Sequence, residues 1–497
     1  MGNSRILLRE RGSVGTADNK TVKIHRFEVG PGVEALTLAF DYGPRVATDR
    51  AKNLPLVEAA FELHTERRRA VLPPEVIAKH RAALNVDARA EGLANLMNVV
   101  LVDERGRWRG RWDRNPSSDA GALVLAKDHA SRGFLPGAIE PGTWSCAIEC
   151  HGIFQDGIAY EVAVEAVPDP GPRAMPSSSS LTTRAKRTGP GWYFGEMHSH
   201  TVHSDGKWEV AGLADKAAST GADFLCLTDH NTLSGHLEPK ETLPLTLVSG
   251  MELTTFYGHH PIYGIDTMIP WHEDGHVLGL AETGARARAM GALVGVAHPF
   301  VPGDPLCTGC RMIAALDPRT FDMMEVWYRR WDSPGADNEA AYALWNEHWR
   351  NGHRILGVAA RDWHGPEQDG PFPGPLPFTG VYARENTPAG ILEALRSGRV
   401  IMSGGPILDV SLREGDRVVT MGGAAKLAAP ALHIEGSAIE GNAELRVFRS
   451  GSLLHGTTTN GPRFDLTVPA PGPGYYRAEL WADERPLVIT NHVVWTA

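Results

Sequence analysis

GEMHSHTVHSDG, residues 195–206, places three histidines and an aspartate directly after an apolar, aromatic run. The apolar run predicts a β-strand, and a strand points alternate side chains to the same face. His198 and His200 would therefore project side by side, and Asp205 follows five residues later. Two imidazoles on one face favour a metal site over a hydrophobic core. The remaining ligands must then come from other parts of the chain.

The composition is that of an ordinary globular protein. The chain has 497 residues, 42% of them hydrophobic and 22% charged, with a formal net charge of −10. A modest negative charge with only short basic runs gives no reason to expect nucleic acid as a partner. The sequence contains no apolar stretch long enough to span a bilayer and no pattern of a signal peptide, so we expect a cytoplasmic protein without a membrane partner.

The chain divides by composition into four parts. Residues 1–168 are expected to form a β-rich, sandwich-like domain. It has strands at 34–42 and 96–104, a hairpin at 142–167 and one helix at 74–98. We assign no catalytic group to this part. Residues 169–191 are rich in Pro, Ser and Gly and predict a linker. Residues 192–405 form the third part, and residues 406–497 predict a small all-β domain.

The third part alternates between strand and helix patterns. Strands are expected at 192–200, 222–231, 245–255, 293–300, 321–328, 354–364 and 399–405, and helices at 209–221, 281–292, 337–352 and 388–398. Repeated alternation of this kind predicts an α/β fold with a parallel sheet, either open or closed into a barrel.

Polar residues stand where these strands end. In order along the chain they are His198 and His200, Asp229 and His230, Glu252, His298, and Asp362 and His364. Thirteen of the 21 histidines lie between His198 and His364. Parallel α/β proteins place their active sites at the carboxyl ends of the strands. Unpaired buried polar groups are costly, whereas metal ions bind neutral imidazole and carboxylate directly. The pattern therefore predicts a metal centre.

These motifs resemble the polymerase and histidinol phosphatase (PHP) superfamily. The segments HSHTVHSDG, TDHN, GMELTT, AHP and RDWH agree with it in order and rough spacing, over Trp192 to about Gly405. The flanking segments GFLPGAIEPGTWS and ILEALRSGRVIMSGGP are similar to the carbaryl-hydrolase-type (CehA/McbA) branch. Glu196 and Arg361 depart from the usual pattern, which has Asp and a small residue there.

The resemblance implies a distorted (β/α)7 barrel that holds two or three divalent ions, Zn, Mn or Fe. One ion would take His198, His200, Glu252 and Asp362. A second would share Glu252 as a bridge and add His259 and His298, although His260 is an alternative to His259. A third would take Asp205, His230 and His364. We assign Glu252, Asp362 and His298 as the catalytic residues. Asp229 is expected to orient an imidazole, and His203 could face either the pocket or the surface.

Two other motifs are weaker. HEDGH, residues 272–276, fits the H-E-x-x-H metalloprotease pattern, which works only within a helix. Here Pro270 precedes it and Asp274-Gly275 favours a turn, so we expect a loop. Cys307 and Cys310 form a lone C-x-x-C, for which free thiols in a loop are the favoured interpretation.

Clustered divalent ions generate hydroxide at neutral pH and hold both oxygens of an in-line displacement. The sequence therefore predicts a hydrolase that uses a metal-bridged hydroxide, on a phosphoester in the favoured interpretation. A carbamate or carboxylic ester hydrolase and a metal-bound, non-catalytic binding protein are the alternatives. The expected partner is a small-molecule substrate, and a homo-oligomer is left open.

Overall fold

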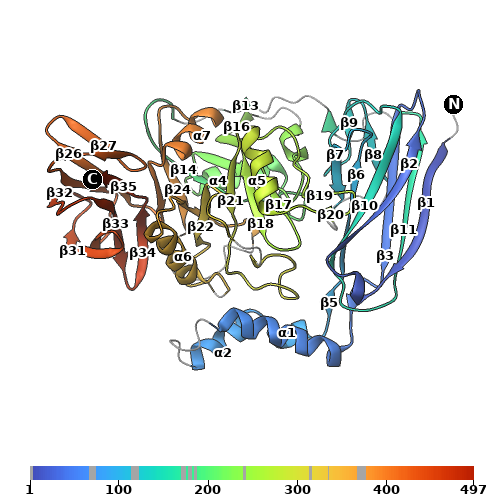
Figure 1. Cartoon of the computed structure of the whole chain (residues 1–497), viewed down its shortest axis with the longest axis horizontal. Helices are drawn as coiled ribbons and strands as arrows, with labels where there is room; N and C mark the ends of the chain where they lie inside the picture. Colours follow the sequence, from blue (N-terminus) through green and yellow to red (C-terminus); the bar gives the residue numbers. More distant parts are fainter. Residues whose placement is uncertain are drawn as a thin grey trace.

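The structure is a computed structural model, and it describes residues 4–66, 74–112, 122–169, 175–176, 182–183, 187–238, 242–312, 316–333, 335–366 and 376–497. It is a mixed α/β protein with many strands and few helices. Figure 1 shows three regions along the long axis: the N-terminal strands at one end, a central region with most of the helices, and the C-terminal strands at the other end.

The N-terminal region consists mainly of two antiparallel sheets packed face to face. The first contains β1 (Arg5–Val14), β11 (Ile158–Val167), β3 (Ala35–Gly43), β8 (Leu123–Ala126), β9 (His129–Ala130) and β12 (Met175–Pro176). The second contains β2 (Thr21–Val29), β10 (Gly142–Gly152), β6 (Leu96–Val102) and β7 (Trp108–Trp112). The apolar side chains between the two sheets form one core. The predicted linker, 169–191, lies largely outside the described residues.

The expected hairpin at 142–167 is wrong. β10 pairs with β2 and β6, whereas β11 pairs with β1 and β3, so consecutive strands belong to opposite sheets. Each strand presents an apolar face, and placing the two faces opposite each other buries both. β10 is buried on its other face too, because Ala147 packs into the central core with Val100 and Trp108. Two buried faces explain why this strand lacks the polar alternation of an exposed sheet.

A helical arm interrupts the sandwich between β4 (Val46–Ala47) and β5 (Leu93–Ala94). It contains α1 (Arg50–Thr65), α2 (Pro74–Ala83) and α3 (Val86–Arg89), where the sequence predicts a single helix at 74–98. Asp49 caps α1 by accepting hydrogen bonds from two backbone N–H groups. Phe61 of α1 packs in a small core with Leu306 of the central region. The arm thus runs beneath the central region, as Figure 1 shows.

Seven strands of the central region follow one another as hydrogen-bonded neighbours. They are β14 (Gly191–Glu196), β15 (Phe224–Leu227), β17 (Thr246–Thr254), β18 (His259–Tyr263), β21 (Leu293–Val296), β22 (Met323–Tyr328) and β23 (Leu356–Ala360). The helices are α4 (Val210–Ser219), α5 (Leu280–Ala289), α6 (Asn338–Arg350) and α7 (Pro388–Ser397), all near their expected positions.

One of the seven strands, β18, is absent from the predicted series and breaks its parallel arrangement, whereas the strand predicted at 399–405 lies outside the seven. β18 runs antiparallel to both neighbours, β17 and β21, while the other neighbouring pairs are parallel. No helix separates β17 from β18. Their short connection is a turn in which Thr255 and Gly258 are hydrogen bonded. Because β18 is reversed, its amino end lies at the same edge as the carboxyl ends of the parallel strands.

The first and last of these strands meet just beyond their carboxyl ends. Ser199 and Trp363 form a parallel bridge. The N–H of Trp363 donates to the His198 carbonyl at 3.0 Å, and the N–H of His200 donates to the Trp363 carbonyl at 2.9 Å. These bonds join the two ends of the seven-strand series.

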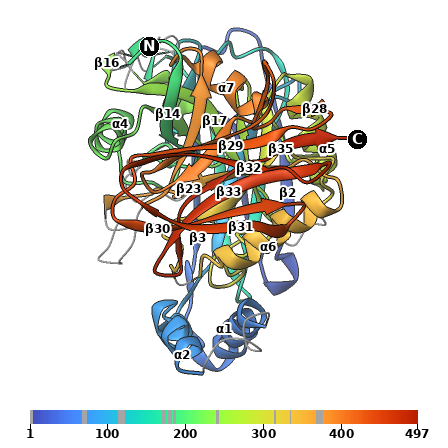
Figure 2. The same ribbon diagram turned by 90° about the vertical axis from the view of Figure 1, so that its left-hand side faces the viewer.

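The C-terminal region is built from strands over its whole length, residues 407–497. One sheet contains β27 (Arg417–Thr420), β26 (Ile407–Glu414), β29 (Ala431–Ser437) and β32 (Arg463–Pro469). The other contains β34 (Arg485–Thr490), β33 (Gly474–Ala482), β30 (Asn442–Arg449), β31 (Ser452–Asn460), β35 (Val493–Thr496) and β28 (Ala424–Lys426). Figure 2 shows these strands from the front.

The C-terminal and central regions share one continuous sheet. β14 pairs with β24 (Phe378–Ala383), β24 pairs with β25 (Val400–Ser403), and β25 pairs with β34. Hydrogen bonding thus crosses the expected boundary near residue 406. In the described part of the chain, none of the helices combines the length and the apolar character that a bilayer span requires.

Candidate metal centre

All the strand ends singled out by the sequence converge on one cluster, which is buried around Glu252 and open to solvent at Asp205. Its side chains form three overlapping groups whose potential ligand atoms lie within 4.8 Å of one another. The groups are His198, His200, Glu252 and Asp362; His200, Asp205, His230 and His364; and His230, Glu252 and His259. The structure therefore brings together eight of the nine residues predicted as ligands, and His298 lies next to them.

The first group is the one implied by the resemblance. Asp362 Oδ1 lies 3.3 Å from His198 Nε2 and 3.0 Å from His200 Nε2. Glu252 faces the same two rings, with Oε1 at 3.2 Å from His198 Nε2 and Oε2 at 3.4 Å from His200 Nε2. Asp362 adopts a left-handed backbone conformation, φ 51°, which turns its side chain inward directly after β23. Four donor atoms thus surround one small space.

The second group differs from the expected set. Glu252 Oε1 lies 3.0 Å from His259 Nδ1, which resolves the choice between His259 and His260 in favour of His259 as the residue beside Glu252. Glu252 Oε2 lies 2.8 Å from His230 Nδ1. His298 Nε2 is farther, at 3.5 Å from Glu252 Oε1, and the ring stacks on His198. His230 therefore takes the place expected for His298 in this group.

The third group contains the expected residues and adds His200. Asp205 Oδ1 lies 3.1 Å from His364 Nε2 and 3.6 Å from His230 Nε2. The His364 ring stacks on His200 with centroids 4.1 Å apart. Burial opposes charge on His364, but the carboxylates of Asp205 and Asp362 outweigh it and raise the pKa of His364 to about 9.

The donor set fits divalent ions. His198 Nε2, His200 Nε2, His259 Nε2 and Glu252 Oε2 are buried and make no hydrogen bond of acceptable geometry with the described residues, although other atoms of the cluster lie as near as 2.8 Å. Buried polar atoms without partners are costly unless another group binds them. Burial, with His364 and His230 nearby, lowers the pKa of His200 to about 4, whereas nearby carboxylates raise the pKa of His364 to about 9. A bound cation would replace the proton on His364, because metal ions and protons compete for the same ring nitrogen. Imidazoles and carboxylates without thiolates suit Zn, Mn or Fe.

Glu325 is a functional candidate that the sequence reading missed. Its Oε1 lies 2.7 Å from His198 Nδ1, and its Oε2 accepts a hydrogen bond from the His298 N–H at 2.8 Å. A carboxylate on the far nitrogen of an imidazole fixes the orientation and tautomer of the ring. The available signal was a single Glu inside the apolar strand β22, where a charged residue is almost never buried without a partner.

Asp229 does not orient an imidazole. It accepts hydrogen bonds from the Thr201 N–H and hydroxyl and from the Ser204 hydroxyl, at 2.7–2.8 Å. It therefore fixes the loop between His200 and Asp205, because a short carboxylate next to a turn satisfies the nearest N–H and O–H donors. His203 is buried, with Ser234 Oγ at 2.8 Å and Glu238 Oε1 at 2.9 Å from its two ring nitrogens, and so is not a surface residue.

Glu196 and Arg361, the two residues that depart from the pattern of the PHP motifs, contact each other. Glu196 Oε2 lies 3.2 Å from Arg361 Nε, and both side chains are buried. Glu196 Oε1 accepts from the N–H groups of His198 and Arg361. Burial, opposed by the Arg361 charge, raises the pKa of Glu196 to about 7. One carboxylate thus joins the chain at His198 to the chain just before Asp362.

HEDGH is not helical, in agreement with the expectation of a loop. It forms a two-stranded hairpin, β19 (His272–Glu273) and β20 (His276–Val277), with Asp274 and Gly275 in left-handed conformations at the turn. His276 is exposed, whereas His272 is buried, with Nε2 at 3.1 Å from Glu149 Oε1. Glu149 also pairs with Arg111 and His151, and this buried network joins the sandwich to the central region.

The expectation of free thiols at Cys307 and Cys310 is wrong. The two residues form a disulfide, because a turn closed by the Cys310 N–H and the Cys307 carbonyl brings their Cα atoms to 5.5 Å. Gly309 in this turn lies against His259 Nε2 and the Thr255 carbonyl. Cys146 and Cys150 are free and buried in the sandwich.

Comparisons with known proteins give partial matches. No protein-family model matches the chain. The 5′–3′ exoribonuclease Rnm of Salmonella typhimurium is 31% identical over 108 residues, which are 20% of this chain and 36% of that relative. The chain therefore spans about a third of the length of this curated relative.

Two solved structures are similar at 16% identity. One is a two-domain protein of Bacteroides vulgatus containing a predicted PHP-like metal-dependent phosphoesterase, with a TM-score of 0.36 over 63% of this chain and 99% of that one. The other is a candidate metal-dependent phosphoesterase of Bifidobacterium adolescentis, with a TM-score of 0.28 over 40% of this chain and 95% of that one. Similarity at this level carries no conclusion about this chain.

Proposed function

We propose that the chain is a metal-dependent hydrolase of the PHP superfamily, CehA/McbA branch, that acts on a phosphoester. The observation that carries the proposal is the buried cluster of overlapping imidazole–carboxylate groups centred on Glu252. Its position at the carboxyl ends of the parallel strands is the position of active sites in α/β proteins. The bonds between Trp363 and residues 198–200 support a distorted seven-stranded barrel.

The proposed ligands are His198, His200, Asp205, His230, Glu252, His259, His298, Asp362 and His364. Divalent ions held there would supply Lewis acidity and acidify a water molecule. Glu252 is suited to join neighbouring ions because its two oxygens face different imidazoles. Asp362 keeps Oδ1 toward the cluster because Tyr328 donates its hydroxyl to Oδ2 at 2.8 Å.

Phosphoester hydrolysis is favoured over carbamate or ester hydrolysis by the curated relative, which is named as an exoribonuclease. A phosphoester also spreads its negative charge over several oxygens, which a multinuclear site stabilises. The carbamate alternative rests on the similarity of the two flanking segments to the carbaryl-hydrolase-type branch. A small-molecule substrate, a cytoplasmic location, and the absence of nucleic-acid and membrane partners stay predictions, and a homo-oligomer stays open.

The test combines elemental analysis of the purified protein with a substrate panel. The panel contains a chromogenic phosphodiester, a phosphomonoester, an aryl carbamate and a short 5′-phosphorylated RNA. We expect two or three equivalents of divalent metal, and turnover of a phosphoester that is abolished by a chelator and restored by metal. Turnover of the carbamate alone would identify the chain as a carbamate or ester hydrolase. Bound metal without turnover of any substrate would support a binding protein, and cleavage of the RNA would overturn the prediction of a small substrate.

A further inference from the structure

A cleft lies at the opposite end of the strands from the metal centre. It has a volume of about 790 Å³, within the range of about 300–1,000 Å³ common for small-molecule sites. Leu293, Met323 and Leu356, the first residues of β21, β22 and β23, line it. Predicted ligands follow the carboxyl ends of two of these strands, His298 after β21 and Asp362 after β23, about 15–20 Å away for strands of this length. The cleft is therefore separate from the proposed active site.

The cleft carries an excess of positive charge. Three arginines line it, Arg288, Arg354 and Arg396, against one acid, Asp322. Arg288 pairs with Asp322 at 2.9 Å, and Arg396 donates to the Gly291 carbonyl at 2.5 Å. Arg354 is exposed and has no ion pair or hydrogen bond with any described residue. Two guanidinium groups thus lack a counter-charge in the cleft, although the chain as a whole has a net charge of −10.

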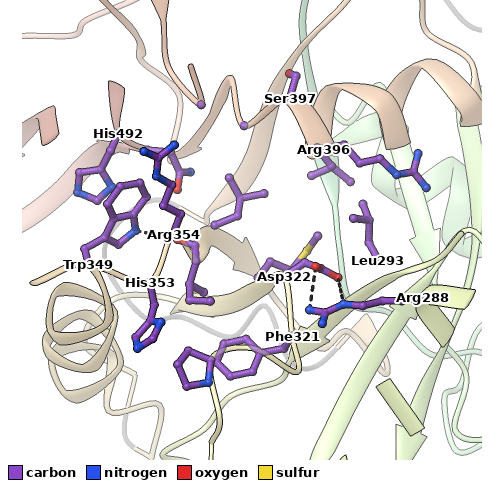
Figure 3. Close-up of a pocket in the computed structure, with 18 of the residues that line it drawn as sticks. Arg288, Leu293, Phe321, Asp322, Trp349, His353, Arg354, Arg396, Ser397 and His492 are labelled. Atoms are coloured by element: carbon purple, nitrogen blue, oxygen red, sulfur yellow. Dashed lines mark hydrogen bonds and ion pairs between the residues drawn. The ribbon is translucent and has the colours of Figure 1, made fainter. Parts of the chain in front are cut away.

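Aromatic rings form much of the rest of the lining. Figure 3 shows Arg354 beside Trp349 and His492, with Arg288, Asp322 and Arg396 on the other side of the view. Trp349 and His492 pack against each other with ring centroids 3.9 Å apart. Phe321 and His353 complete the set of rings. Flat rings of this kind pack well against an aromatic ligand.

His492 adds a hydrogen-bond donor without a partner. Its Nε2 lies 3.3 Å from an Arg477 guanidinium nitrogen, which can only donate, so Nε2 is the acceptor. Burial and the Arg477 charge lower the pKa of His492 well below its usual range, so the ring is neutral and carries its proton on Nδ1. Nδ1 is buried and has no partner among the described residues.

We infer that this cleft binds a small organic anion in which a phosphate or carboxylate group is attached to an aromatic ring. Guanidinium groups match the planar geometry of these acid groups, and the rings of Trp349 and Phe321 cover the aromatic part. The inference goes beyond the proposed hydrolase activity and does not depend on it.

The cleft lies at the junction of the central and C-terminal regions. Gly422, Asn491 and His492 come from the C-terminal region, whereas the other lining residues come from the central region. Asn491 holds the two together through two hydrogen bonds of 2.8 Å with the Gly357 backbone. A ligand that touches both regions stabilises this junction at the base of β23, the strand that leads to Asp362.

Calorimetric titration of the metal-loaded protein with phenylphosphonate and with benzoate tests the site. The variant is Arg354→Glu, because Arg354 is exposed and its replacement leaves the core intact. The matched control is Arg417→Glu, which makes the same charge change at an exposed position of β27. Inorganic phosphate is titrated in parallel, because it lacks the ring and reports how much of the affinity comes from the acid group alone.

We expect at least one of the two aromatic anions to bind wild type and Arg417→Glu equally, and to bind Arg354→Glu at least tenfold more weakly. Whichever of the two binds identifies phosphate or carboxylate as the acid group. Basal hydrolysis should be unchanged in both variants. Equal affinity in all three proteins, no binding of either anion, or weakening in both variants would overturn the inference. So would loss of aromatic-anion binding by wild type after its metal is removed with a chelator, because it would place the anions at the metal centre.

Discussion

Glu252 is the residue on which the candidate metal centre depends. His200 and His230 are also shared between groups, but one imidazole nitrogen binds a single ion, whereas a carboxylate can bridge two. Glu252→Gln keeps the size of the side chain and removes its charge and one good donor oxygen. We therefore expect loss of at least one metal equivalent and at least a hundredfold loss of activity, with an unchanged circular dichroism spectrum.

The matched control for this prediction is His364→Asn. His364 belongs only to the group around Asp205, so this variant should lose no more than the ion of that group. Near-normal turnover and full metal content in Glu252→Gln would place the bridge elsewhere and remove the basis of the ligand assignment.

Glu325 provides a second prediction at this scale. Its contact with His198 Nδ1 holds the ring with Nε2 toward Glu252 and Asp362. Loss of such an orienting carboxylate typically reduces metal affinity or activity about 10–100-fold. We expect Glu325→Gln to reduce metal affinity in this range in a chelator competition assay. Unchanged affinity would mean that packing alone orients His198.

His151 gives a prediction about pH. Burial lowers the pKa of His151 to about 4, although Glu149 opposes the shift. The unfolded chain therefore binds a proton between about pH 6.5 and 4 that the folded protein does not bind, so stability falls as the pH falls through this window. A shift from 6.5 to about 4 corresponds to about 3 kcal/mol. His151→Gln should lose less stability than wild type over this range, as measured by thermal unfolding at a series of pH values.

Residues at or near strand ends were predictable, and a residue in the middle of a strand was not. His198, Glu252 and Asp362 could be found because a parallel sheet collects strand ends at one edge. Glu325 lies inside an apolar strand, and which ring it contacts depends on how β22 sits beside β14 in three dimensions. Asp229 was assigned the wrong partner because a carboxylate accepts equally well from hydroxyl and backbone donors, and the sequence does not rank them.

Among the elements, the β19–β20 hairpin separates two histidines that look equivalent in the sequence. His272 is buried and contacts Glu149, whereas its neighbour across the hairpin, His276, is exposed. We expect His272→Ala to destabilise the protein by about 1–3 kcal/mol, because a buried partner of Glu149 is lost. His276→Ala should change stability by less than about 0.5 kcal/mol. Metal content should be unchanged in both. Loss of a metal equivalent in His272→Ala would restore the H-E-x-x-H motif as a ligand pair.

Element positions followed from periodicity, but pairings did not. The four helices of the central region begin and end close to their expected residues, since an amphipathic pattern is local. The partners of β10 and the direction of β18 depend on contacts between residues far apart in the chain. The reversal of β18 also explains why His259 lies at the start of a strand, whereas Glu252 lies near the end of β17 and the other candidate ligands follow strand ends.

At the scale of the whole molecule, the sandwich covers apolar surface of the central region. Trp108 and Val100 of the sandwich pack in the same core as Phe256 and Trp271. A chain that starts near residue 190 would expose these side chains, so we expect it to aggregate or elute as large oligomers in size-exclusion chromatography. A soluble monomer with full metal content would show that the interface is dispensable and that the predicted boundary separates independent units.

The hydrogen bonds between Trp363 and residues 198–200 close the ring of strands at the metal centre. The first and last strands meet at the very segments that carry His198, His200 and Asp362. Any motion that parts these strands also pulls the candidate ligands away from one another, and an ion bound between them resists that motion by mass action. Ion binding and closure of the ring would then be thermodynamically coupled, so that release of the ion favours separation of the first and last strands and their separation favours release of the ion.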